Sequence, residues 1–214
     1  MLTGPMRHIP SCEYRRQPWR NGAGWTREIL VLPDGPDWSL RLSIAEFGEP
    51  SAYSSFAGVE REQLLLSGGG LRLDFGDGRR QDLLPPHGRV RFTGEQAPAA
   101  APLEGPVQVF NLMWRPQAVE ARLLHRPLVG GMYCFVGADT AWAVHVIGGS
   151  AHVSGQEGRC MLEAGDTAWL PGGAGQRRYA IDGAGEIVLV RVDRVGAGMA
   201  PALDGPVGVD GAAQ

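Results

Sequence analysis

Arginine, asparagine and glycine residues cluster in the segment PWRNGAGWTREI near the N-terminus, and this combination could bind an anion. Asn21 followed by Gly22 favours a turn with exposed backbone amides, which can bind a carboxylate. Arg20 and Arg27 flank the turn and could add charge-assisted hydrogen bonds. The alternative is a purely structural turn, because glycines of this kind usually serve the backbone first. The segment therefore predicts either an anion site or a structural turn.

Two polar residues in strand-like segments are also candidate ligand contacts. Arg41 lies on the polar face of WSLRLSI, in which apolar and polar residues alternate as they do along a β-strand. If that face lines the interior of a barrel, the guanidinium of Arg41 points at a bound carboxylate; otherwise it faces solvent and pairs with Glu46 or Glu60. Asn111 could hydrogen-bond a ligand, or equally satisfy a neighbouring backbone group.

The ionisable side chains give little support for metal binding or catalysis. A zinc or iron site needs three or four converging ligands, and the sequence predicts no metal and no cofactor. We expect these histidines to be structural or exposed: His87, His125, His145 and His152. Glu28 could act as an acid or base or contact a ligand, but no paired carboxylates and no Ser-His-Asp order can be read from the sequence.

Short apolar runs separated by glycine and proline predict an all-β fold of the sandwich or barrel type. The run LRLDF is followed by Gly-Asp-Gly at 76–78, which predicts a hairpin turn. Similar strand, glycine turn, strand patterns occur in both halves, with Gly148-Gly149 as the turn in the second half. Another Asp-Gly turn is expected at 182–183. The similarity of the halves predicts two tandem barrels.

The predicted units are residues 1–115, residues 116–195 and a flexible tail over residues 196–214, which has few large apolar groups. A net charge of −3 gives no reason to expect binding to nucleic acid or to an anionic membrane. The sequence contains no apolar run of membrane-spanning length and no recognisable signal peptide. Three separated cysteines indicate reduced thiols, and we expect a cytoplasmic protein.

The second half contains GDTAWLPGGAGQ at 165–176, which resembles the second cupin motif. In that motif a Gly-Asp turn leads into a strand, Pro-x-Gly ends the strand, and a metal-binding histidine follows. Gln176 stands where the histidine would be. The ligands of the first cupin motif, expected near 133–143, are absent as well. The resemblance therefore implies a cupin barrel without the usual metal site.

The first half resembles the HutD/Ves family over five segments in order. They are PWRNGAGWTREI (18–29), WSLRLSIA (38–45), SSFAGVER (54–61), FTGE (92–95) and FNLM (110–113). Together with the cupin-like second half, the resemblance implies a bicupin of the jelly-roll type. Members of this family are associated with histidine utilisation, where a regulatory role and binding of a metabolite such as formylglutamate have been proposed.

Our leading hypothesis is a non-catalytic protein whose first barrel binds a small carboxylate metabolite. Arg61, which ends a family segment, would hold the carboxylate together with Arg20, and Trp19 and Phe56 would supply apolar walls. One alternative is a cupin enzyme, such as an isomerase, that needs no metal or uses an atypical one. Another is a structural protein whose barrels form a homo-oligomer interface. Fold alone does not choose among them.

Overall fold

The computed structural model describes residues 2–196 and confirms the all-β prediction. The described residues form sixteen strands and one short 3-10 helix, η1 (Ser11–Glu13). In this part of the chain, no helix has the length and apolar character required to cross a membrane. The predicted tail falls outside the described residues apart from Gly196.

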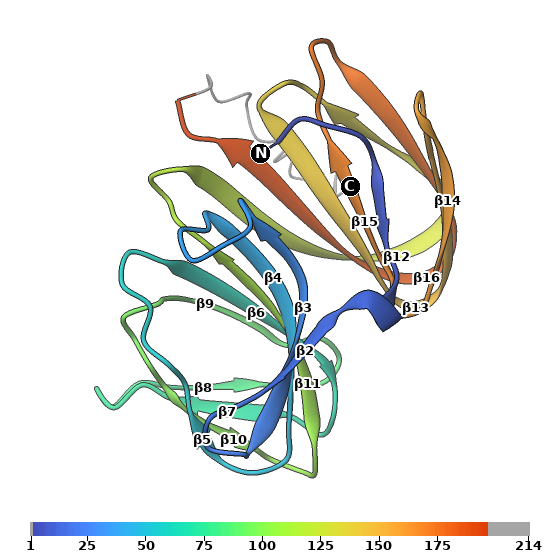
Figure 1. Ribbon diagram of the computed structural model, residues 1–214. Coiled ribbons are helices and arrows are strands. Elements are labelled where there is room, and N and C mark those ends of the chain that lie inside the picture. The colour runs from blue at the N-terminus through green and yellow to red at the C-terminus, as the bar shows by residue number, and fades with distance from the viewer. Residues whose placement is uncertain (1, 197–214) are drawn as a thin grey trace, which may run out of the picture.

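The first unit is a sandwich of two antiparallel sheets (Figure 1). The larger sheet has the order β2-β3-β4-β11-β6-β9. Its strands are β2 (Arg15–Pro18), β3 (Gly24–Leu32), β4 (Leu40–Phe47), β11 (Val107–Trp114), β6 (Glu60–Ser67) and β9 (Arg89–Thr93). The smaller sheet contains β5 (Ser51–Ala52), β10 (Ala99–Pro102), β7 (Leu71–Asp74) and β8 (Arg80–Leu83). The pairing of β7 with β8 confirms the predicted hairpin.

The second unit is built on one strongly curved sheet of six strands. Its path is β1-β15-β13-β16-β12, and β14 pairs with β13. The strands are β1 (Arg7–Ile9), β15 (Thr167–Pro171), β13 (Thr140–Gly155), β16 (Arg177–Arg194), β12 (Val119–Val136) and β14 (Gly158–Glu163). Because β1 pairs with β15, the start of the chain joins the second unit. The predicted division at residue 115 stays a prediction.

Two predicted turns in the second half are wrong, because their glycines lie inside continuous strands. Gly148-Gly149 belongs to β13 and Asp182-Gly183 to β16, and these two strands pair along their length. The register of that pairing shifts between Val146 and Gly148, which marks a β-bulge. A Cβ atom on Gly149 would meet the carbonyl oxygen of Ala184. These glycines therefore permit a close approach of two bent strands.

Both faces of the larger sheet are buried, and this decides where its polar residues go. Leu42 and Leu112, on the apolar face, belong to a core cluster that also contains Leu123 and Val190 of the second unit. The two units therefore share one apolar core. Along β4 and β11 every second side chain points the other way, into the first unit. Arg41 and Ser43 of β4 and Asn111 of β11 consequently face the interior of the sandwich, whereas Glu46 and Gln108 lie on the other face, at the end of the sheet.

Candidate functional site

A cavity of about 580 Å³ opens inside the first unit, between the larger sheet and the segment that follows β5. The cavity is lined by the turn after β2, by the inward faces of β4, β6 and β11, and by residues 52–56. Seven predicted site residues line it: Trp19, Arg20, Asn21, Arg41, Phe56, Arg61 and Asn111. Gly22, Arg27 and Glu28 do not line this cavity. Its size matches that of a small-molecule pocket.

Arg61 is the most unusual residue of the cavity, because its charge is buried and no acidic residue of the described part of the chain pairs with it. Only 4% of the residue is exposed. Its Nη2 donates to Oδ1 of Asn111 at 3.2 Å, whereas Nε and Nη1 have no hydrogen-bond partner within residues 2–196. Burial lowers the pKa of Arg61 to about 10, so that it remains charged at neutral pH. A buried charge is costly unless it is paired, and an anionic ligand would supply the missing partner.

Aromatic rings surround the guanidinium of Arg61. Its Cζ lies 4.9 Å from the ring centre of Tyr53, 5.0 Å from that of Phe92 and 5.8 Å from that of Phe56. Cation–π contacts of this kind lower the cost of burying the charge. Nε and Nη1, which have no partner among the described residues, could donate to a planar acceptor such as a carboxylate.

Neighbouring polar groups extend the donor set around Arg61. Nε2 of Gln63 donates to Oδ1 of Asn111 at 2.9 Å, which fixes that amide with its oxygen toward the two donors. The buried hydroxyl of Tyr53 has no hydrogen-bond partner among the described residues. Burial raises the pKa of Tyr53, so its hydroxyl stays protonated and can donate. Arg61 and Tyr53, which both line the cavity, thus each carry a buried polar group with no hydrogen bond of good geometry among the described residues, although Gln63 lies close enough to Tyr53 to oppose the rise of its pKa.

Arg41 lines the cavity but already has an acidic partner. Its Nε lies 3.0 Å from Oε2 of Glu28, and Nη1 of Arg15 lies 3.5 Å from Oε1 of the same carboxylate. Arg41 thus lines the cavity, as one alternative predicted, and its acidic partner is Glu28 instead of the predicted Glu46 or Glu60. Glu28 holds Arg41 in place from outside the cavity. Arg27 pairs with Glu46 at 2.7 Å and also lies outside the cavity lining.

The polar groups of the turn after β2 form hydrogen bonds within the turn and to a neighbouring serine. The backbone N–H of Gly22 donates to the carbonyl of Trp19 at 3.0 Å, and that of Ala23 donates to Oδ1 of Asn21 at 3.1 Å. Nδ2 of Asn21 donates to Oγ of Ser51 at 2.6 Å. Gly22 has a φ of 71°, which favours glycine. The two amides are therefore engaged within the turn and are not available to an anion.

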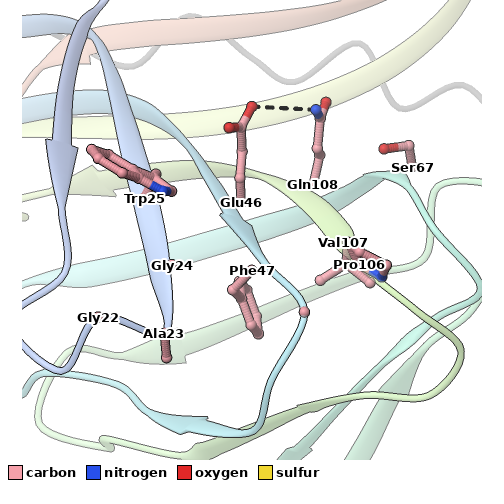
Figure 2. A pocket seen from close by; sticks show the side chains of 11 residues that line it. Gly22, Ala23, Gly24, Trp25, Glu46, Phe47, Ser67, Pro106, Val107 and Gln108 are labelled. Atoms are coloured by element: carbon pink, nitrogen blue, oxygen red, sulfur yellow. Dashed lines mark hydrogen bonds between the residues drawn. The ribbon is translucent and has the colours of Figure 1, made fainter.

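Gly22 contributes to a second hollow of about 420 Å³ at the end of the larger sheet (Figure 2). Its charged side chain is already paired, since Nε2 of Gln108 donates to Oε1 of Glu46 at 3.2 Å. Glu46 is also the partner of Arg27. This hollow lacks the unpaired buried charge that distinguishes the cavity around Arg61.

Tyr53 and Gln63 belong to the surroundings of Arg61 but are not among the residues that the sequence predicts. Gln63 follows Arg61 by two residues, so strand periodicity places both side chains on one face once Arg61 is known to point inward. Tyr53 lies in an irregular segment whose position depends on tertiary packing. No local pattern in the sequence indicates that Tyr53 lies close to Arg61.

The two units together define the class of protein, a bicupin. Over 87% of its length, the chain superposes on 85% of an oxalate decarboxylase chain from Lactobacillus farciminis, with a TM-score of 0.62 and 10% identity. At this identity the likeness concerns the fold alone, and it confirms the predicted two-barrel architecture.

The chain belongs to the HutD family, whose family model matches residues 11–189. The structure of HutD from Pseudomonas fluorescens SBW25, described as a formate condition, has a TM-score of 0.74 and 28% identity over 90% of this chain and 100% of that chain. An uncharacterized 21.2 kDa protein in the hutC 3' region of Pseudomonas putida is 40% identical over 115 residues, which are 52% of this chain. The chain spans 59% of the length of that relative.

Proposed function

We propose that the cavity of the first unit binds a small carboxylate metabolite, and that the protein acts through this binding as a non-catalytic regulator in histidine utilisation. The observation that carries the proposal is the buried guanidinium of Arg61, with two nitrogens unpaired inside a cavity. The hydroxyl of Tyr53, which has no hydrogen bond of good geometry among residues 2–196, could add a neutral donor. A carboxylate offers two coplanar acceptor oxygens, which is the geometry that a guanidinium recognises.

The size of the cavity favours a metabolite larger than a single carboxylate group. Polar residues such as Ser43 and Ser54 and apolar ones such as Met113 line the remaining space. A formylglutamate-like molecule combines a carboxylate for Arg61 with further polar groups for such a lining. Formate in the name of one related structure and hutC in that of another relative agree with a carboxylate ligand and with this pathway.

Calorimetric titration of the full chain with formylglutamate, glutamate, urocanate and formate tests the proposal. We expect saturable binding of at least one of the larger carboxylates, at a stoichiometry of one. The Arg61→Met variant should bind it about a hundredfold more weakly, since losing one partner of a buried charge pair costs several kcal/mol. Arg72→Met is the matched control, because Arg72 is exposed on β7 and pairs with Asp82 outside the cavity.

The fold of Arg61→Met is checked by its urea unfolding midpoint. Methionine fills similar volume without a charge, so the variant should be at least as stable as the parent protein. Absence of binding by all four carboxylates, or equal affinity in the parent and in a folded Arg61→Met, would contradict the proposal.

A further inference from the structure

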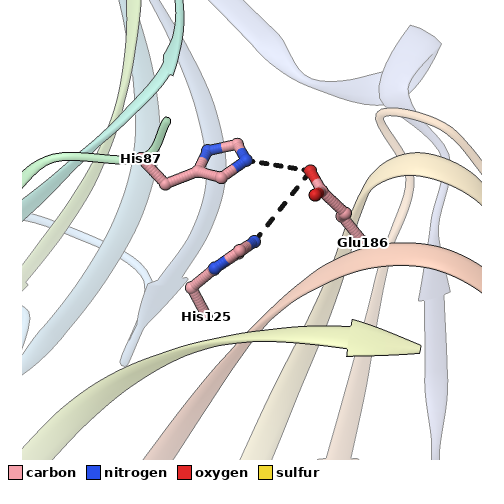
Figure 3. A group of neighbouring side chains, drawn as sticks. All are labelled: His87, His125 and Glu186. Carbon is pink, nitrogen blue, oxygen red and sulfur yellow. Dashed lines mark hydrogen bonds and ion pairs between the residues drawn. The ribbon is translucent and has the colours of Figure 1, made fainter. Parts of the chain in front are cut away.

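Two histidines and a glutamate meet where the two units join (Figure 3). His87 lies in the turn between β8 and β9 of the first unit, whereas His125 lies in β12 and Glu186 in β16 of the second unit. His125 is opposite Val188 in the β12–β16 pairing, so Glu186, two residues away, shares its face of the sheet. One potential ligand atom from each residue lies within 4.8 Å of the other two.

The hydrogen bond of His87 to the backbone determines which of its nitrogens faces the glutamate. Nδ1 lies 3.0 Å from the carbonyl oxygen of Leu65. A carbonyl only accepts, so Nδ1 carries a hydrogen, and in a neutral ring Nε2 then carries a lone pair. That Nε2 lies 2.9 Å from Oε2 of Glu186. Two lone pairs at this distance repel each other unless a cation lies between them.

His125 faces the same carboxylate oxygen. Its Nε2 lies 4.0 Å from Oε2 of Glu186 and, although buried, has no hydrogen-bond partner in the part of the chain described. The rings of His87 and His125 lie against each other, with centres 4.2 Å apart and planes inclined by 40°. A proton held between His87 and Glu186 would leave the nitrogen of His125 unsatisfied. A metal ion would use all three groups at once.

The backbone at His87 is held in an unusual conformation that directs the ring. Its φ of 56° lies in the left-handed region, which is uncommon for a residue other than glycine. Such conformations cost free energy and persist where the surrounding structure requires them, often at functional sites. Here the conformation brings the imidazole from the first unit to the carboxylate of the second.

We propose that His87, His125 and Glu186 bind a divalent ion of the zinc type at the junction of the two units. Imidazole and carboxylate are ligands that zinc accepts in tetrahedral sites, and such sites place ligand atoms about 3.3 Å apart. The observed separations of 2.9 Å and 4.0 Å lie on either side of that value. Half of the side-chain surface of Glu186 is exposed, which leaves access for the ion and a water as fourth ligand.

This site is distinct from the metal position of cupins, which lies inside a barrel and where this chain has Gln176. It is also separate from the cavity around Arg61, whose lining includes none of the three ligands. Because one ligand comes from the first unit and two from the second, the ion would link the units. Magnesium and calcium prefer larger sets of oxygen ligands, so the site should discriminate against them.

Calorimetric titration of chelator-treated full-length protein with Zn²⁺ tests the inference. We expect one ion per chain, no detectable binding of Mg²⁺, and a rise in the thermal unfolding midpoint with zinc. His125→Ala and Glu186→Gln should each weaken zinc binding at least about tenfold, as loss of even an outer-shell partner does, and should abolish the thermal shift. His87→Asn should do the same, because asparagine tolerates the left-handed backbone.

His152→Ala is the matched control, since this histidine is exposed on β13 and lies outside the cluster. Its zinc affinity should equal that of the parent protein. Cobalt provides a second readout, because the visible spectrum of bound Co²⁺ reports tetrahedral coordination by nitrogen and oxygen. If the parent protein shows no saturable zinc binding, or if all three folded ligand variants bind zinc like the parent, the site does not exist.

Discussion

At the scale of single residues, the first unit buries a charge at a position where an apolar side chain would cost less free energy. Arg61 is buried among Tyr53, Phe56 and Phe92, and replacing a buried charge by an apolar residue is often neutral or stabilising. Its hydrogen bond to Asn111 alone gives no reason for a guanidinium, because Gln63 already donates to the same oxygen. Stability alone therefore gives no reason for this guanidinium, and the proposed carboxylate ligand would account for it.

His145 is a second buried polar residue, and neighbouring side chains hold its ring. It is 2% exposed, and its Nδ1 lies 3.0 Å from Oγ1 of Thr167, which in turn contacts the hydroxyl of Tyr14 at 2.6 Å. Burial, with a smaller contribution from Arg27, lowers the pKa of His145 from 6.5 to about 4. The folded protein therefore holds this ring neutral at pH values where the unfolded chain would protonate it.

This shift predicts a loss of stability in acid. Between pH 6.5 and about 4 the unfolded chain binds a proton at His145 that the folded protein does not, so the free energy of unfolding falls as the pH falls. The loss reaches roughly 3 kcal/mol at the lower end of that window. Urea unfolding of the parent, His145→Gln and the exposed control His152→Gln at pH 7.5 and 4.5 measures it. The stability difference between the two pH values should shrink only in His145→Gln; an unchanged difference would refute the assignment.

At the scale of elements, strand alternation predicted part of the site. The pattern of WSLRLSI correctly separated Arg41 from Leu42 and Leu40, but it could not say which face is interior. Both faces are buried here, the apolar one against the second unit and the polar one around the cavity. The approach of Arg61 to Asn111 depends on the β6–β11 register, which joins residues far apart in sequence. A single sequence does not reveal such pairing.

The segment that carries Phe56 is held to the larger sheet by a glycine. The N–H of Phe56 donates to the carbonyl of Gly94 at 2.8 Å, and the N–H of Gly94 donates to the carbonyl of Val59 at 2.6 Å. A Cβ atom on Gly94 would meet the backbone oxygen of Phe56. The wall of the cavity therefore depends on a close backbone approach, for which glycine is required.

We predict that Gly94→Ala displaces this wall. The variant should lose about 1–3 kcal/mol of unfolding free energy, as other overpacked positions do, and its carboxylate affinity should fall with the displaced Phe56. Gly137→Ala is the control, because a Cβ atom there meets nothing within 4 Å. Urea unfolding and calorimetry measure the two effects. Parent-like affinity in Gly94→Ala would show that the segment does not shape the cavity.

At the scale of the whole molecule, the two units are less independent than the internal similarity of the sequence indicates. The two-barrel architecture followed from the family segments and from the regular spacing of short apolar runs. The shared core did not, because the apolar residues of β4 look the same whether they fill a barrel or cover a partner sheet. Leu42 and Leu112 pack in one cluster with Leu123 and Val190. Separating the units would expose this surface on both.

The shared core predicts that the two units unfold together, and a substitution in one should weaken both. Val190 is fully buried in β16, so Val190→Ala should cost about 2 kcal/mol through lost burial and a cavity. Hydrogen exchange followed by mass spectrometry then reports each sheet separately. In the variant, the exchange rates of the slowest amides should rise by the same factor in β11 as in β16. Val129→Ala, at a residue that is 89% exposed on β12, should change the exchange rates of neither β11 nor β16. Acceleration confined to β16 would mean that the first unit keeps its own stability, and that the contact between the units is a docking surface between two independently folding domains.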